Sequence, residues 1–325
     1  MSEKNIPVVP MQTMQFSFDK QVAPVLTIHS GDEVIFMTED ANVSKITQES
    51  DVYDDFQKLL EAGGGCNPIS GPVYVAEAKK GDYLAVEILS VKAGEERGGG
   101  YTALYPGLGA LSSPFSIQDD LEPRTKICEM QGDEGIFKLH NQDKVIRFSL
   151  NRFIGTIGVA PKEDRRSAFQ HGKDYCGNVD CPDIRQGVTV VLPCNVDGGL
   201  LSIGDVHGAQ GDGEITGCAL ECRGEVRVRV SVLSAQQAQY ADWPQVNCEQ
   251  FIGSIICGGA LNLSDQIRAG YVDLVKRMER YYGFDKLDAY QLLNLVGKVR
   301  IGQVCESEYS CVVKIDRSYL VPSER

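Results

Sequence analysis

Residues 204–221, GDVHGAQGDGEITGCALE, gather side chains that can bind a metal ion or move a proton into a stretch with little bulk. Asp205 and His207 stand two residues apart, so on a β-strand they project from one face and can bind one centre. In the loop that follows, polar residues alternate with glycines: Gln210, Asp212 and Glu214 with Gly208, Gly211 and Gly213. Glycine carries no Cβ, so this backbone can approach an ion or a small substrate closely. The stretch predicts a site in which small residues make room and polar residues line it.

A second stretch with similar chemistry is DYCGNVDCPD, residues 174–183, where Asn178 and Asp180 also stand two apart. One imidazole with several carboxylates from separate segments suits zinc, iron or manganese with a position left open for water. Such an ion lowers the pKa of bound water and polarises a carbonyl, which is the chemistry of amide hydrolysis. Asp, Asn and Gly are also the ordinary residues of turns, so turn formation alone is the competing interpretation.

The composition is that of an ordinary globular protein. The 325 residues are 42% hydrophobic and 24% charged, which favours one or two closely packed domains. The net charge of −13 and a pI near 4.9, without a Lys/Arg cluster, exclude nucleic acid and anionic membranes as expected partners. The absence of a long apolar run or a leader-like start predicts a cytoplasmic protein. The 11 cysteines match no zinc-knuckle or thioredoxin spacing, so we expect reduced, mostly buried thiols.

The elements that must position these residues are mainly strands. Five segments alternate apolar and polar residues between turn residues: residues 32–38, 82–92, 144–150, 188–196 and 225–233. Such alternation is typical of half-buried antiparallel strands, and it predicts a β-sandwich or barrel. Helical periodicity occurs at residues 52–63, 264–283 and 286–297, with Ser264 as a candidate N-cap and Gly283 as a stop. A helix pair is therefore expected beside the last part of the β structure.

Several of these segments resemble the acetamidase/formamidase family. The resemblance is carried by LLSIGDVHGAQGDGEITGCALE, by FIGTIGVAP at residues 153–161 and by CGNVD at residues 176–180. NPISGPVYVAEAKKGDYLAVEI and AYQLLNLVGKVRIGQV, at residues 289–304, extend it in order from about residue 25 to residue 305.

The resemblance implies a mainly β fold with α/β elaboration: a jelly-roll-like β-sandwich plus a smaller α+β part. We expect an N-terminal β-rich part over residues 1–160, closely packed on residues 161–325, which carry the acidic/His motif and the helix pair. The resemblance also implies a homo-oligomeric amidase that cleaves a short amide such as formamide or acetamide to ammonia and a carboxylate.

The residues and the resemblance together assign roles. Asp180 matches the aspartate of the family's Gly-Gly-Asn-x-Asp phrase, and Asp40 in TEDAN matches its Asp-Ala phrase. We expect the ligands of a divalent metal, zinc first among the candidates, to be Asp205, His207, Asp180 and Asp40. The predicted catalytic residues are Glu214 as general base, with Asp212 and Gln210. The predicted substrate-binding residues are Tyr175, Asn178, Gly211 and Gly213, the glycines through loop N–H groups near the oxyanion.

Two departures from the family pattern support alternatives. The chain has Tyr175-Cys176 where the family has His-Gly, and Ala76-Glu77 where it often has Glu-Gly. A tyrosine is a weaker neutral ligand than an imidazole, and a shift of one residue turns a strand side chain to the opposite face. One alternative is a small-molecule or metal-binding protein that kept the fold and lost or changed the activity. The other is a metal-free amidase with Cys176 as nucleophile and His207 as base.

Overall fold

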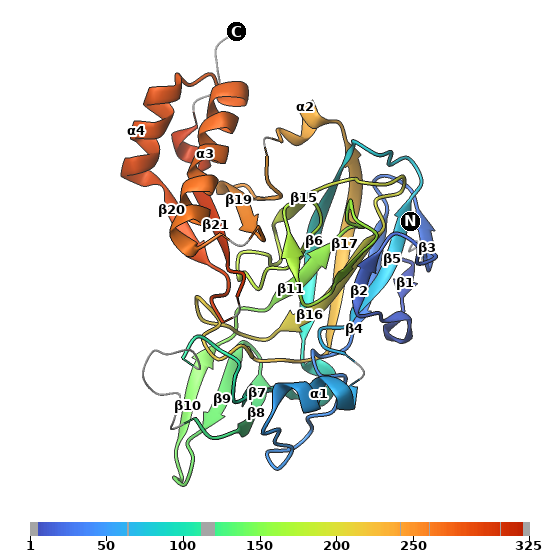
Figure 1. The fold of residues 1–325 in the computed structure, drawn as a ribbon, viewed down its shortest axis with the longest axis vertical. Coiled ribbons are helices and arrows are strands. Elements are labelled where there is room, and N and C mark those ends of the chain that lie inside the picture. The colour runs from blue at the N-terminus through green and yellow to red at the C-terminus, as the bar shows by residue number, and fades with distance from the viewer. Residues whose placement is uncertain are drawn as a thin grey trace.

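The computed structural model describes residues 6–63, 65–111, 121–240, 242–259, 261–305 and 307–320. The described strands form a 9-stranded, a 6-stranded, a 4-stranded and a 2-stranded sheet, with a few helices outside them (Figure 1). The mainly β fold predicted from the alternating segments is confirmed. In the described part, no helix is long and apolar enough to cross a membrane.

The largest sheet shows why the alternating segments form strands. In β17, alternate residues are buried, and the arginines between them pair with glutamates of the neighbouring strands. This is the pattern of a strand with one face on the core and one face in water. The strands of this sheet are, in spatial order, β1 (Val8–Val9), β4 (Glu33–Thr38), β17 (Gly224–Leu233), β6 (Tyr83–Ala93), β15 (Thr189–Pro193), β18 (Gln245–Asn247), β19 (Phe251–Cys257), β21 (Ser310–Asp316) and β20 (Lys298–Ile301).

The second sheet carries the site and packs on the first. Its strands are β13 (His171–Gly172), β14 (Cys176–Asn178), β11 (Phe153–Gly158), β16 (Leu201–His207), β5 (Ile69–Val75) and β3 (Leu26–Ile28). One core cluster joins Val86 and Val228 of the 9-stranded sheet to Ile154 and Ile203 of this one. All residues of β16 are buried, because it lies inside the sheet and between the layers. Residues before and after position 160 share both sheets, and the domain boundary there stays a prediction.

The smaller elements flank this sandwich (Figure 1). The 4-stranded sheet is β10 (Val145–Ser149), β9 (Glu134–Lys138), β8 (Arg124–Gln131) and β7 (Gly99–Leu104), and the 2-stranded sheet is β12 (Arg165–Ser167) and β2 (Ser17–Asp19). The helices are α1 (Phe56–Gly63), α2 (Ala235–Ala238), α3 (Leu263–Tyr282) and α4 (Lys286–Val296), with 3-10 turns η1 (Met11–Thr13), η2 (Glu95–Arg97) and η4 (Arg317–Tyr319).

The predicted helix pair is present as α3 and α4, which share a core cluster with β19 and β21. Helix α3 begins earlier than expected: Asn262, not Ser264, is the N-cap, and its side chain accepts the N–H of Asp265. Gly283 ends the helix in the left-handed conformation, as predicted.

Candidate active site

Strand β16 delivers Asp205 and His207 to one buried place, as their spacing predicted. His207 Nε2 lies 3.3 Å from Asp205 Oδ1 and 3.3 Å from Glu221 Oε2. The chain returns to this point because Glu221 bridges both His207 and Tyr101 as a β partner. The ring of Phe153, opposite His207 on β11, packs edge-on against the imidazole. The Asp205 and His207 side chains therefore lie between β11 on one side and the segment around Glu221 on the other.

The three facing atoms have no hydrogen-bond partner among the described residues. They are Asp205 Oδ1, His207 Nε2 and Glu221 Oε2, and all are buried. Buried polar atoms are nearly always paired, because leaving them unpaired away from water costs free energy. Three such atoms converging on one point are the arrangement expected where a cation binds.

Two further carboxylates complete the cluster. Potential ligand atoms of Asp180, Asp205 and His207 lie within 4.8 Å of one another, and so do those of His207, Glu214 and Glu221. One imidazole with carboxylate oxygens suits zinc, manganese or iron. The residues present thus fit a divalent metal ion.

Gln210 determines which nitrogen of His207 faces the cluster. Gln210 Nε2 donates to the carbonyl oxygens of Asp180 at 2.6 Å and Gly302 at 3.1 Å. Its Oε1 is therefore the atom that lies 3.0 Å from His207 Nδ1. An amide oxygen only accepts, so Nδ1 carries a hydrogen, and in the neutral ring Nε2 offers its lone pair to the cluster. A histidine whose outer nitrogen is held in this way is typical of a metal ligand.

A polar floor orients Asp205 and Asn178. Asn67 Nδ2 donates to Asn178 Oδ1 at 3.0 Å and to Asp205 Oδ2 at 3.1 Å. Thr156, opposite Asn178 in the β11–β14 pairing, donates to Asn178 Oδ1 as well. Asn178 thus lies at the site, where it was predicted to bind substrate, and it is held by two donors.

Four polar residues of the site have left-handed backbone conformations. The φ angles are 51° at Asn67, 44° at Asp180, 52° at Asp205 and 44° at Glu214. Non-glycine residues adopt positive φ infrequently, at a cost of order 1–3 kcal/mol each. Such residues gather at functional sites, because the surrounding structure holds them there.

The buried carboxylates of the cluster require a compensating positive charge. Burial by itself lowers the pKa of His207, but the carboxylates of Glu221 and Asp205 outweigh it and hold that pKa well above its usual value. Burial raises the pKa of Glu221 and raises that of Glu214 to about 8, while His207 opposes both shifts. The buried carboxylates are thus compensated either by an imidazolium or by a bound cation.

A cavity of about 20 Å³ opens onto Asp180, Asp205, Glu214 and Glu221. That volume is room for roughly one water-sized group. Its other wall contains Phe56 of α1, Tyr105 and Phe169, whose rings pack with centroids 5.8 Å (Phe56–Tyr105) and 5.7 Å (Phe56–Phe169) apart. A buried acidic cluster thus faces a small, aromatic-walled space.

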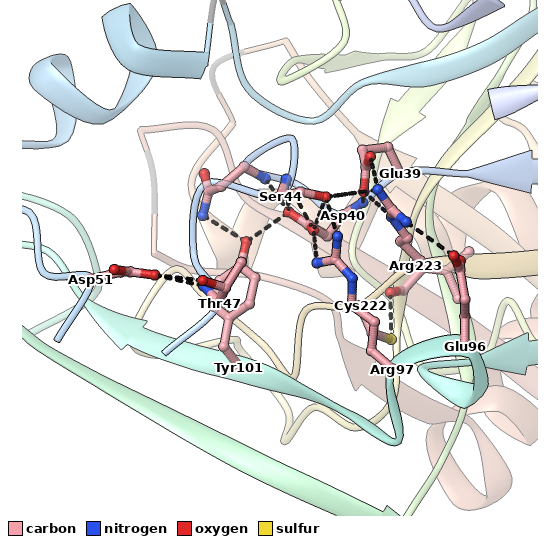
Figure 2. Close-up of polar contacts among 12 residues, drawn as sticks. Glu39, Asp40, Ser44, Thr47, Asp51, Glu96, Arg97, Tyr101, Cys222 and Arg223 are labelled. Carbon is pink, nitrogen blue, oxygen red and sulfur yellow. Dashed lines mark hydrogen bonds and ion pairs between the residues drawn. The ribbon is translucent and has the colours of Figure 1, made fainter. Parts of the chain in front are cut away.

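Asp40 is not brought into the ligand cluster. The backbone N–H groups of Asn42 and Ser44 donate to its carboxylate at 3.0 Å and 3.1 Å, and Arg97 lies 3.4 Å from it (Figure 2). The carboxylate of Asp40, which was expected to bind the metal, is therefore already surrounded by hydrogen-bond donors of the protein. Burial raises its pKa, as does the charge of neighbouring Glu39.

Other predicted residues also lie apart from the cluster. Asp212 is half exposed and pairs with Arg300 at 2.6 Å. Tyr175 packs on Phe18 in the main core and does not line the cavity. Gly211 is exposed, and the N–H of Gly213 donates to the carbonyl oxygen of Gly302 at 3.1 Å, so it is not turned toward a substrate.

Several site residues escaped the sequence reasoning. Glu221 closes the GCALE end of the motif, but its distance along the chain from His207 gave no signal that the two meet. Asn67 belongs to NPISGP, one of the segments that carry the resemblance, so its place at the site was within reach of that comparison. Thr156 lies in FIGTIGVAP, another segment that carries the resemblance, whereas Tyr105 had no signal, because only its hydrogen bond to Asn42 and its place at the cavity bring it here.

The profile of the Acetamidase/Formamidase family matches residues 9–174 and 168–315. Acetamidase from Bacillus halodurans superposes with a TM-score of 0.83 and 30% identity, over 96% of this chain and 98% of that chain. Acetamidase from Yersinia enterocolitica does so with 0.85 and 29%, over 98% of this chain and 94% of that chain. Formamidase from Methylophilus methylotrophus is 24% identical over 223 residues, 53% of this chain and 53% of that protein. The chain spans about half the length of the curated relatives it matches.

Proposed function

The chain belongs to the acetamidase/formamidase family, and from that membership we propose that it hydrolyses a short aliphatic amide to ammonia and a carboxylate. The observation that carries the proposal is the buried convergence of Asp205 Oδ1 and Glu221 Oε2 on His207 Nε2, each at 3.3 Å, with no hydrogen bond made by any of the three atoms among the described residues.

The proposed ligands of a divalent cation, zinc in the first instance, are Asp205, His207, Glu221 and Asp180. When bound, such an ion would polarise the amide carbonyl and lower the pKa of a water molecule. Gln210 would keep His207 Nε2 turned toward it, and Asn67 would hold the second oxygen of Asp205.

Glu214 is the proposed general base: burial raises its pKa to about 8, and a bound cation would offset that rise and keep the carboxylate ionised. Its carboxylate lines the cavity and accepts a hydrogen bond from Cys305 Sγ at 3.6 Å. It would take a proton from the attacking water as the new C–O bond forms, and return it to the amide nitrogen as the C–N bond breaks. Ammonia and the carboxylic acid are then the products, and the acid ionises in solution.

The small cavity supports a small substrate. A cavity of about 20 Å³ has room for roughly one water-sized group, so we expect only the smallest amides to enter, with displacement of the cavity walls.

The homo-oligomer implied by the family is also part of the proposal, and light scattering on the purified protein would measure it.

The test combines elemental analysis of the purified protein with an ammonia-release assay on formamide, acetamide and larger amides. We expect a stoichiometric divalent metal, turnover of the smallest amides, loss of turnover on exhaustive chelation and recovery when zinc is restored. Turnover that survives complete metal removal but is lost in Cys176→Ser would replace this mechanism with the cysteine one. Against that alternative, Cys176 is 0% exposed and belongs to the main core cluster. A metal-loaded protein inactive on every amide would instead indicate a binding protein.

A further inference from the structure

Amide hydrolysis needs a hydrogen-bond donor for the carbonyl oxygen, which gains negative charge as water attacks. The N–H of Gly213, the expected loop donor, is bonded to the carbonyl oxygen of Gly302. The carboxylates that line the cavity can only accept when ionised, and the amide hydrogens of Asn42 and Asn67 are used within the protein. The amide and hydroxyl side chains at the cavity with a donor left are Asn178, through its Nδ2, and Tyr105, through its hydroxyl.

Tyr105 is placed to be that donor. It is 4% exposed and lines the cavity together with Asp205, Glu214 and Glu221. Its hydroxyl oxygen accepts a hydrogen bond from Asn42 Nδ2 at 2.9 Å. Among the described residues, no acceptor for the hydroxyl's own hydrogen is present. Burial raises the pKa of Tyr105 well above its usual value, so the hydroxyl keeps its hydrogen at neutral pH.

Asn42 determines the direction of that hydrogen. Its Nδ2 donates to Tyr101 Oη at 2.7 Å and to Tyr105 Oη at 2.9 Å, which uses both amide hydrogens. Each tyrosine oxygen is therefore an acceptor toward Asn42 and must direct its own hydrogen elsewhere. For Tyr101 the acceptor is Asp40 Oδ1 at 3.3 Å. For Tyr105 the remaining direction is the cavity.

The loop that carries Asn42 is anchored by Asp40. Figure 2 shows the Asp40 carboxylate among Ser44, Arg97 and Tyr101, with Glu39 paired to Arg223 beside it. The backbone also ties this loop to the site, since the N–H of Asn67 donates to the carbonyl oxygen of Ala41 at 2.9 Å. Asp40 thus has a structural reason to be present without binding a metal.

We propose that Tyr105 donates a hydrogen bond to the carbonyl oxygen of the amide substrate, with Asn42 and Asp40 as the residues that position it. The inference rests on the proposed amide hydrolysis and adds to it the group that stabilises the oxyanion. The hydroxyl hydrogen stays on Tyr105 throughout, so no covalent step is involved.

The first test compares Tyr105→Phe with Tyr101→Phe, because both remove one hydroxyl that Asn42 contacts. Of the two tyrosines, only Tyr105 lines the cavity. We expect Tyr105→Phe to lower kcat for acetamide about 100- to 1000-fold, as the loss of an oxyanion donor does, with a smaller change in KM. Tyr101→Phe should lose about tenfold or less. Metal content and Tm, measured on both, show whether either variant has lost the site or the fold.

A Tyr105→Phe variant with wild-type kcat and full metal content overturns the inference and leaves the hydrolase proposal intact. Equal losses in the two variants also overturn it, because they would indicate a structural role shared by both tyrosines. Asn42→Asp provides a second variant, since a carboxylate accepts the Tyr105 hydrogen and turns it from the cavity. We expect a loss of kcat similar to that of Tyr105→Phe, and wild-type kcat in Asn42→Asp contradicts the positioning role.

Calorimetric binding of acetamide separates this inference from the hydrolase proposal. If the wild-type protein releases no ammonia, the hydrolase proposal fails, and the donor role of Tyr105 is judged by binding alone. Weaker acetamide binding in Tyr105→Phe than in Tyr101→Phe, at equal metal content, then supports the inference. Equal binding in the two variants overturns it, and wild-type protein that neither binds nor hydrolyses acetamide overturns both proposals.

Discussion

At the scale of single residues, the site combines unfavourable backbone conformations with carboxylates that repel one another. Asp180, Asp205 and Glu214 all have positive φ, and their carboxylates share one buried space with His207. Left-handed backbone and like charges both oppose this arrangement. The residues around them must supply the stabilisation, and two of these neighbours can be tested directly.

Gly155 on β11 lies directly beneath two of the carboxylates. A Cβ at this position would lie 2.7 Å from Asp180 Oδ1, 2.7 Å from Asp205 Oδ2 and 2.8 Å from Asp205 O. We expect Gly155→Ala to displace both carboxylates and to lower the metal content of the purified protein. Gly211→Ala is the matched control for metal content, because a Cβ there has no heavy atom within 4 Å. Equal metal content in the two variants would contradict the proposed ligand set.

Gln210 offers a second test at this scale, since it touches His207 but is not a ligand. Gln210→Met keeps the length of the side chain and removes the acceptor for the Nδ1 hydrogen, which leaves the imidazole free to change tautomer. We expect metal affinity to fall about 10- to 100-fold, the usual effect of losing such a partner. Competition with a chromophoric chelator measures the affinity. Unchanged affinity would show that His207 is oriented without Gln210.

At the scale of elements, alternation predicted strands well and loops poorly. Period-2 spacing brought Asp205 and His207 to one place because both belong to β16, although Asp205 itself has a positive φ of 52°. The same argument failed for Asp212 and Glu214, which lie beyond its end: Asp212 reaches Arg300 at the surface, while Glu214 turns into the cavity. Asp212 and Glu214 lie outside the strands, where two-residue spacing does not determine the direction of a side chain. The positive φ of Glu214, 44°, leaves no mark in the sequence, because the residue is not a glycine.

The family resemblance supplied what local patterns could not, and it had its own limit. It correctly indicated the fold, and it agreed with the local pattern in marking Asp180, which lies at the same site as Asp205. It also marked Asp40, whose structural contacts are those of a loop anchor. A motif shows that a residue type matters at a position, but not whether it serves as a ligand or as a support. Glu221 is the opposite case, a residue at the site for which no role was predicted. The chain returns to His207 at Glu221, and neither the sequence around His207 nor that around Glu221 indicates this contact.

A prediction at the scale of elements concerns the contact between β13 and the C-terminal segment. His171 begins β13 and is 4% exposed, and its Nε2 lies 3.2 Å from the carbonyl oxygen of Glu308 and 3.2 Å from Gln303 Nε2. Burial lowers the pKa of His171 from its usual value of 6.5 to about 4. Below about pH 6.5, His171 binds a proton in the unfolded chain but not in the folded chain. Its contribution to stability is therefore complete above pH 6.5 and is lost as the pH falls toward 4.

We expect that lowering the pH from about 7.5 to about 5.0 decreases the free energy of unfolding by about 2 kcal/mol through His171 alone. His171→Gln retains a hydrogen-bonding group that does not titrate in this range. Urea unfolding at both pH values should therefore show a pH-dependent loss that is smaller in the variant by about that amount. Identical losses in the two proteins would mean that His171 takes up a proton in the folded state. Other titrating groups act in both proteins and cancel in the comparison.

At the scale of the whole molecule, the site lies where the main layers and the added segments meet. Its residues come from β14 and β16 of the 6-stranded sheet, and from the segments that precede β5 and follow β16. Gln210 also connects it, through Gly302, to the segment between β20 and β21. A cation bound here would join parts of the chain that are distant in sequence. Its effect should therefore extend to the stability of the whole protein.

The last prediction is that metal removal lowers the Tm of the intact chain, and not only its activity. A ligand present at about 1,000 times its Kd stabilises the folded state by about 4 kcal/mol. For 325 residues this corresponds to a Tm difference of roughly 6 °C. The buried carboxylates then repel one another unless His207 takes up a proton, so the loss should be larger at high pH than near neutrality. Calorimetry of chelator-treated and zinc-restored protein, with metal content measured on each, gives the difference. If metal-free and zinc-restored protein have the same Tm at both pH values, the cluster holds no structural cation. The charges of its carboxylates are then compensated by groups of the protein itself.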